Sequence, residues 1–91
     1  MALLDLLGRR WALRMIWELR TPAPTFRALQ ARCHGMSSSV LSQRLAELGE
    51  AGIVTARPAG GYALSRDGRA LLTALGPLDQ WARRWADRAR R

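Results

Sequence analysis

The strongest hydrophobic pattern lies in residues 35–52, where GMSSSVLSQRLAELGEAG predicts a single helix. Its apolar stripe follows the 3.6-residue helical period and consists of Leu41, Leu45 and Leu48. Ser37 stands where an N-cap residue belongs, and Gly52 stands where a left-handed residue would end the helix. The opposite face is small, polar and nearly uncharged: Ser39, Ser42, Gln43 and Ala46, with Ser38 and Arg44 on the flanks. A face without bulk or charge favours close approach by a large partner.

Apolar residues also dominate the segment before this helix. Residues 2–20 predict helix interrupted at Gly8, and the second part, RRWALRMIWELR, is apolar on two sides, which indicates burial on two sides. Two prolines end it. Thr25 then predicts the cap of a short helix, and residues 34–35 predict the turn into the serine-rich helix. Two short helices joined by a glycine-containing turn form a helix-turn-helix pattern.

After residue 52 the pattern becomes extended. Residues 53–57 predict a strand rich in β-branched side chains, and residues 62–64 predict a second strand. The intervening segment, PAGG, has the composition of a tight turn. Together these segments predict a small hairpin of the size called a wing.

The last predicted helix begins after a cap at Ser65. Its apolar seam is spaced by threes and fours: Leu71, Leu72, Leu75, Leu78, Trp81 and Trp85. Gly76 and Pro77 interrupt the seam, so we expect a kink or a break there. The two tryptophans lie one turn apart near the end of the chain, where little of their own domain is left to pack on. They therefore indicate contact with a second copy of the protein.

Length and composition restrict the class of protein. Ninety-one residues make one domain, with too short a chain for two independent cores. Fifteen arginines and no lysine against seven acidic residues give a formal net charge of +8, which is typical of a nucleic-acid partner. The single cysteine predicts a reduced, cytoplasmic protein. No apolar run approaches the ~20 residues of a membrane span, and the N-terminus has the wrong order for a secretory signal.

These observations predict a fold that is mainly α with a small β-hairpin, over a single domain of residues 1–91. The helix-turn-helix covers about residues 25–52, and the wing covers about residues 53–64. The C-terminal helix covers about residues 66–89, and its two tryptophans indicate that it serves dimerisation. The fold class is therefore a winged helix-turn-helix, to which the resemblance described next adds N- and C-terminal dimerisation helices.

Four segments in this order resemble the HxlR-type winged helix-turn-helix transcriptional regulators of bacteria and archaea. They are LLGRRW at 6–11, PTFRAL at 24–29, GMSSSVLSQRLAELGEAGIV at 35–54 and GYALSRDGRALL at 61–72. The resemblance implies a homodimer that binds pseudo-palindromic operator DNA and dimerises through the first and last helices. The hairpin is shorter than the family's usual wing, the recognition helix is less charged, and the N-terminal cysteine of redox-sensing members is missing.

Candidate DNA-contacting residues follow from the charge and the helix faces. Gln can pair with adenine and Ser with either base type, so the polar face of the serine-rich helix is expected to reach base edges. Arg44 is expected to bind a phosphate or to pair with Glu47 or Glu18. Arg9 and Arg10 are further phosphate candidates, and the tail arginines Arg83, Arg84, Arg88, Arg90 and Arg91 are expected to be solvated. The full predicted DNA-binding set is Ser37, Ser38, Ser39, Ser42, Gln43, Arg44, Arg27 and Arg57.

The predicted dimer interface is apolar and comes from both ends of the chain: Leu3, Leu4, Leu7, Trp11, Leu78, Trp81 and Trp85. The tryptophans admit a second interpretation. Trp11, Trp17, Trp81 and Trp85 could line a pocket for a small-molecule effector between the first and last helices, although packing is the more frequent use of such side chains. The sequence leaves an effector open as a partner.

Nothing in the sequence predicts catalysis, a cofactor or a bound metal. Cys33 falls on the apolar stripe of the short helix and is expected in the core. A lone Cys33–His34 pair lacks the further ligands of a zinc site and the third group of a catalytic triad. We therefore expect a sequence-specific transcriptional regulator and not an enzyme. The alternatives are a winged-helix protein-interaction module and a basic nucleic-acid binder without operator specificity.

Overall fold

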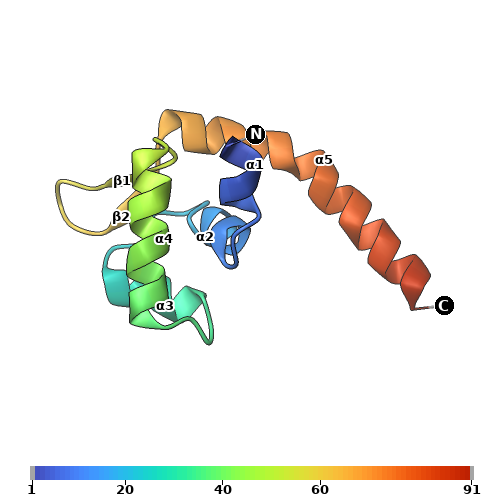
Figure 1. Ribbon diagram of the computed structural model, residues 1–91, viewed down its shortest axis with the longest axis horizontal. Helices are drawn as coiled ribbons and strands as arrows, with labels where there is room; N and C mark the ends of the chain where they lie inside the picture. Colours follow the sequence, from blue (N-terminus) through green and yellow to red (C-terminus); the bar gives the residue numbers. More distant parts are fainter. Residues whose placement is uncertain (1, 91) are drawn as a thin grey trace.

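Five helices and one β-hairpin make up residues 2–90, the part of the chain that this computed structural model describes (Figure 1). In chain order they are α1 (Ala2–Leu7), α2 (Ala12–Glu18), α3 (Phe26–Arg32), α4 (Ser38–Glu50), β1 (Val54–Ala56), β2 (Tyr62–Leu64) and α5 (Arg66–Ala89). The prediction of a mainly α fold with a small hairpin is confirmed.

Hydroxyl caps start three of these helices. Thr25, Ser37 and Ser65 each accept a hydrogen bond from the backbone N–H three residues further on, at 3.0, 3.2 and 2.9 Å respectively. Each bond satisfies a donor that the first helical turn leaves without a partner. Gly52 follows α4 with φ of 76°, the left-handed conformation expected of a glycine beyond a helix end. The predicted helix limits therefore rest on local chemistry.

The N-terminal helical segment is divided more widely than the sequence suggested. The predicted interruption at Gly8 extends through Trp11, and α2 begins only at Ala12. Trp11 has φ of 78°, a left-handed conformation that is uncommon for a bulky residue. Its ring is half-buried against the core, so packing holds the backbone in this conformation.

One hydrophobic core joins α2, α3, α4 and the hairpin. Its largest fully buried side chains are Met15, Ile16, Leu19, Leu29, Leu41, Leu48 and Cys33. The hairpin adds Ile53, Val54 and Leu64, each 5% exposed or less. The stripe predicted on the serine-rich helix is thus the face that α4 buries, and the prediction that Cys33 belongs to the core is confirmed.

The wing is tied to the loop before α3. β1 and β2 pair antiparallel with Val54 opposite Leu64. Ala23 forms an additional bridge with Tyr62, through reciprocal N–H to O hydrogen bonds of 2.9 Å each. Gly61 permits this approach, because its φ is +81° and a Cβ on it would overlap the Ala23 carbonyl oxygen. The wing therefore has a third pairing segment that the sequence did not reveal.

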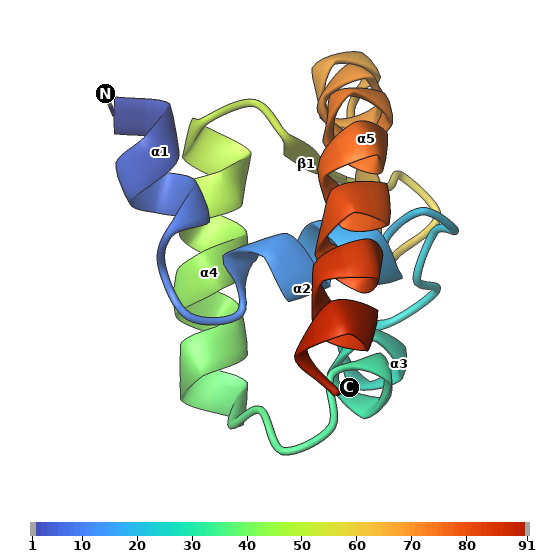
Figure 2. The same cartoon turned by 90° about the vertical axis from the view of Figure 1, so that its right-hand side faces the viewer.

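Helix α5 is continuous across Gly76 and Pro77, so of the two predicted alternatives, a kink or a break, the break does not occur. In Figure 1 its first part runs along the domain, and the later part turns and extends away from the other elements. Figure 2 shows the same helix beside α2. Proline forfeits one backbone hydrogen bond but keeps a helical φ, and the surrounding helix is largely exposed, so water can serve the freed carbonyl.

Candidate nucleic-acid interface

The outer face of α4 presents short polar side chains to solvent. Burial of the leucine stripe turns Ser38, Ser39, Ser42 and Gln43 outward, and all four are exposed. Ser37 is exposed too, and its Oγ both caps α4 and lies 3.3 Å from the Ser39 Oγ. The hairpin lies beside this helix (Figure 1). Helix α4 and the wing together form one polar surface without a bulky side chain on the helix.

Arg44, on the flank of α4, is bound within the domain. Its guanidinium pairs with Glu47, and its Nε donates to the Arg10 carbonyl at 2.9 Å. Only 13% of its side chain is exposed. Glu47 also forms an ion pair with Arg9, whose Nε lies 2.9 Å from the Glu47 Oε2. Of the two roles considered for Arg44, the structure contains the ion pair with Glu47, which lies within α4. The hydrogen bond to the Arg10 carbonyl and the pair between Arg9 and Glu47 connect α4 to the loop between α1 and α2.

Arg27, on α3, and Arg57, which follows β1 in the wing, are both exposed. The Arg57 backbone N–H donates to the Gly61 carbonyl at 2.9 Å, which closes the hairpin turn. Arg27 borders an open depression of about 580 Å³ at the turn between α3 and α4. Within this turn, Gln30 Nε2 donates to the Met36 carbonyl at 3.2 Å. Both side chains are therefore accessible from solvent to a negatively charged polymer.

Cys33 has the environment of an inert thiol. It is fully buried, and burial, followed by the charge of Glu18, raises its pKa above the ordinary value. Reactive cysteines instead have a lowered pKa and an accessible sulfur. Residues 2–90 contain no group of three His, Cys, Asp or Glu side chains able to hold a metal ion. His34, next to Cys33, is exposed.

The predicted dimer residues divide into two sets. Leu3, Leu4, Leu78, Trp81 and Trp85 are 41–61% exposed, which is unusual for side chains of this size. The Trp81 and Trp85 rings stack with centroids 6.5 Å apart. Leu7 and Trp11, by contrast, are half-buried against the domain's own core. The exposed set therefore leaves an apolar surface on α1 and α5 that its own chain does not cover.

A cleft of about 230 Å³ separates α2 from α5. Its walls are largely apolar: Leu13, Ile16, Trp17, Leu72, Leu75, Gly76, Leu78, Asp79 and Ala82. Of the four tryptophans proposed for an effector pocket, only Trp17 lines this cleft. Leu13 and Trp17 are also more than 40% exposed. Both belong to the segment that the sequence indicates to be apolar on two sides, yet neither was assigned to the predicted interface.

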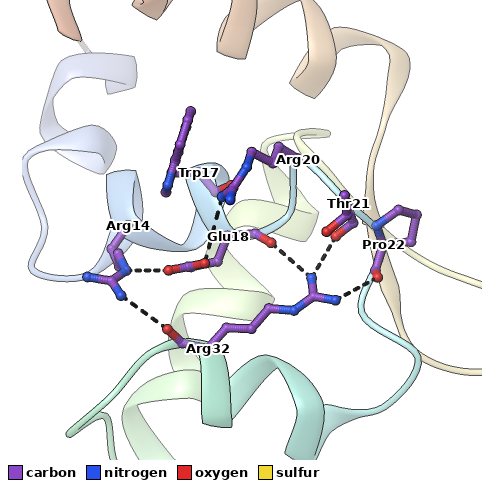
Figure 3. Close-up of polar contacts among 7 residues, drawn as sticks. All are labelled: Arg14, Trp17, Glu18, Arg20, Thr21, Pro22 and Arg32. Atoms are coloured by element: carbon purple, nitrogen blue, oxygen red, sulfur yellow. Dashed lines mark hydrogen bonds and ion pairs between the residues drawn. The ribbon is translucent and has the colours of Figure 1, made fainter.

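Sequence reasoning assigned no role to Arg32, whose side chain makes the most extensive polar contacts of the helix-turn-helix (Figure 3). Its Nη1 donates to the carbonyls of Glu18 and Thr21, at 2.9 and 2.7 Å, and its Nη2 donates to the Pro22 carbonyl at 3.0 Å. Its only sequence signal was a basic residue in the last turn of a short helix, which is too common to predict such contacts.

Capped helices joined by a tight turn, a paired hairpin and a small-residue outer helix face define a winged helix-turn-helix DNA-binding protein. Residues 6–90 match the family model described as HxlR-like helix-turn-helix, so the chain belongs to this family. The protein is accordingly a DNA-binding transcriptional regulator, as predicted.

Relatives agree with this assignment. The chain is 32% identical over 89 residues to the "uncharacterized HTH-type transcriptional regulator YvaP" of Bacillus subtilis (strain 168), covering 91% of this chain and 82% of the relative. It is similar to "a possible HxlR family transcriptional factor" from Thermoplasma volcanium GSS1 (TM-score 0.82, 28% identity, 92% of this chain, 81% of that chain). It is also similar to quinone-bound YodB from B. subtilis (TM-score 0.74, 30% identity, covering 96% of this chain and 92% of that chain).

The family and these relatives are transcriptional regulators and not enzymes, in agreement with the prediction. Within residues 2–90, no helix has the length and apolarity needed to cross a membrane.

Proposed function

We propose that two copies of this protein bind an imperfect inverted repeat in double-stranded DNA, with α4 of each copy in the major groove of one half-site. The observation that carries the proposal is the outer face of α4, which is exposed, polar and free of bulky side chains beside the wing. The major groove is wide enough to admit an α-helix, and short side chains on the outer face let the helix backbone lie close to the base edges. The two-fold symmetry of a dimer matches the symmetry of an inverted repeat.

Within this arrangement, Gln43 is the best candidate for base discrimination, because its amide can pair bidentately with adenine. Ser38, Ser39 and Ser42 are short enough for direct or water-mediated contact with base edges. Ser37 contributes mainly by capping α4. Arg27 and Arg57 bind phosphates, which supplies affinity without sequence information. Arg44 is not part of the proposed contact, since Glu47 and the Arg10 carbonyl already engage it.

The second copy covers the apolar surface of α1 and α5. The side chains that carry this part of the proposal are Leu3, Leu4, Leu78, Trp81 and Trp85. Aromatic side chains are enriched at the centres of such interfaces, and large exposed apolar patches mark interaction surfaces. Because the later part of α5 extends away from the domain (Figure 1), it can reach a second copy without disturbing the recognition face.

Binding-site selection followed by gel-shift titration at ~150 mM salt, near physiological ionic strength, tests the proposal. We expect a selected inverted repeat with half-sites about one helical turn apart. Gln43→Ala should weaken this site by about 1–3 kcal/mol and relax selectivity at one position. The matched control is Gln80→Ala, an exposed glutamine on α5, which should leave selectivity unchanged.

Three outcomes separate the alternatives. Equal affinity for every duplex would contradict operator specificity. Abolished binding after deletion of residues 83–91, with no effect of Gln43→Ala, would indicate a general basic nucleic-acid binder. Absence of DNA binding together with retention of a protein partner would indicate an interaction module.

A further inference from the structure

The guanidinium of Arg32, at the end of α3, binds three backbone carbonyls within residues 18–22. Through the carbonyls of Glu18, Thr21 and Pro22 it holds the end of α2 and the following loop (Figure 3). Carbonyls at a helix end lack intrahelical partners and carry partial negative charge, so a cation is favoured there. The planar guanidinium can donate several hydrogen bonds in fixed directions, which a lysine ammonium cannot reproduce.

The loop held by Arg32 continues directly into the wing. Ala23 follows Pro22 and exchanges two hydrogen bonds of 2.9 Å with Tyr62 in β2. A side chain on Gly61 would collide with Ala23 and Pro24, so the wing is packed tightly on this loop. A displacement of the loop would therefore displace the hairpin.

The backbone of Arg32 continues in the other direction into the recognition helix. Arg32 is the last residue of α3, and the turn from Cys33 to Met36 leads to the Ser37 cap of α4. Arg14, itself paired with Glu18 at 2.6 Å, donates to the Arg32 carbonyl at 3.2 Å. The residue is thus fixed at its carbonyl by α2 and at its guanidinium by the loop.

We propose that Arg32 is a positioning residue that sets the wing and the recognition helix in one fixed relation, so that both reach the same duplex. This inference rests on the proposed DNA binding by α4. Arg32 itself does not contact the nucleic acid, because its donors are directed at the protein's own backbone. Without Arg32 the two elements are no longer held in register, so binding carries the added cost of bringing them into place, while the phosphate contacts of the bound complex stay the same.

Operator titrations over a range of salt concentrations distinguish positioning from direct contact. Arg32→Met keeps the length of the side chain and removes its donors, and we expect roughly tenfold weaker operator binding, comparable to the loss of one base contact. The slope of log affinity against log salt should stay at the wild-type value. The matched contrast is Arg27→Met on the same helix, which should weaken binding and reduce the slope by about 0.9.

Two results of these titrations would overturn the inference. A reduced slope for Arg32→Met would identify Arg32 as a phosphate contact. Wild-type affinity, measured at a temperature where circular dichroism shows the variant fully folded, would show that the hydrogen bonds contribute only to stability. Arg32→Lys keeps the charge without the planar fork, and we expect it to bind more weakly than wild type. Wild-type operator affinity in Arg32→Lys would show that the planar guanidinium is not needed and would contradict the argument from its hydrogen-bond directions.

Amide hydrogen exchange gives a readout that does not depend on DNA. In Arg32→Met, the amides of Ala23 and Tyr62 should exchange faster, while the amide of Leu41 in α4 keeps its wild-type rate. Unchanged exchange at Ala23 and Tyr62, or an equal increase at all three amides, would overturn the inference. If wild-type protein selects no operator yet exchange responds as expected, the proposed function fails and the linkage stands.

Discussion

Helix α4 and the later part of α5 have similar apolar patterns, but the apolar side chains of α4 are buried and those of α5 are exposed. In α4, Leu41 and Leu48 are fully buried, whereas Leu78, Trp81 and Trp85 in α5 are more than half exposed. Both sets follow a spacing of threes and fours, which predicts a helix with one apolar face. Helix α4 crosses the domain, whereas the end of α5 projects from it (Figure 1). The comparison teaches that periodicity identifies the face to be covered but not the molecule that covers it.

The arginines of the helix-turn-helix and of the end of α5 differ in the same way. Arg32 and Arg44 bind backbone carbonyls and carboxylates within the domain. In α5, Arg83 pairs with Asp79 at 3.1 Å, but 72% and 56% of the two side chains are exposed, so this pair contributes little. Arg84, Arg88 and Arg90 are exposed, as expected of a solvated tail. Arg91 lies outside the described residues.

The largest expected difference comes from the same substitution in both regions. Leu48→Ala removes a fully buried side chain and should lower the free energy of unfolding by about 2–5 kcal/mol. Leu78→Ala removes a side chain that is 54% exposed, and the unfolding of the monomer should change by less than ~0.5 kcal/mol. Urea denaturation at dilute protein concentration measures both values. Equal losses would show that the apolar face of α5 is already covered within its own chain.

The second expected effect concerns association. Trp85→Ala should raise the dissociation constant of the proposed homodimer about thirtyfold, corresponding to ~2 kcal/mol for an aromatic side chain buried in an interface. Sedimentation equilibrium measures the constant, and circular dichroism should show unchanged helix content. Arg84→Ala, an exposed neighbour on the same helix, serves as the control and should leave the constant close to wild type. A Trp85→Ala protein that associates as tightly as wild type would refute this interface.

The smallest expected effect is a stabilisation. A Cβ on Gly76 would meet no atom within 4 Å, so alanine fits without a clash. Gly76→Ala should raise the free energy of unfolding by about 0.5–1 kcal/mol, because alanine loses less conformational freedom in a helix. Thermal unfolding measures the change, with Gly61→Ala as the opposite case, since a side chain there collides with Ala23. Destabilisation by Gly76→Ala would show that the helix needs glycine at the bend.

Local chemistry made much of the fold predictable. The three hydroxyl caps, the left-handed Gly52 and the leucine stripe of α4 depend on residues within a few positions of one another. The exposed polar face of α4 followed directly, because it is the complement of that stripe. The hairpin followed from its β-branched strand and its glycine-rich turn.

Contacts between distant segments were not predictable in the same way. The bridge between Ala23 and Tyr62 joins residues far apart in the chain. The partners of Arg32 are backbone carbonyls, which every residue has and no sequence pattern distinguishes. Trp11, which was predicted to lie in the dimer interface, is half-buried against the core and has a left-handed backbone, and no local pattern indicated either feature.

The sequence by itself determined the helices, the hairpin, the basic charge and the polar face of α4, because caps, periodicity and composition act over short distances. Only the tertiary structure decided which arginines are engaged internally and which apolar side chains stay exposed. It also decided that Arg32 binds the loop at Thr21 and Pro22, which continues into the bridge between Ala23 and Tyr62. These features depend on where distant backbone groups meet, and that is fixed only when the core has brought the elements together.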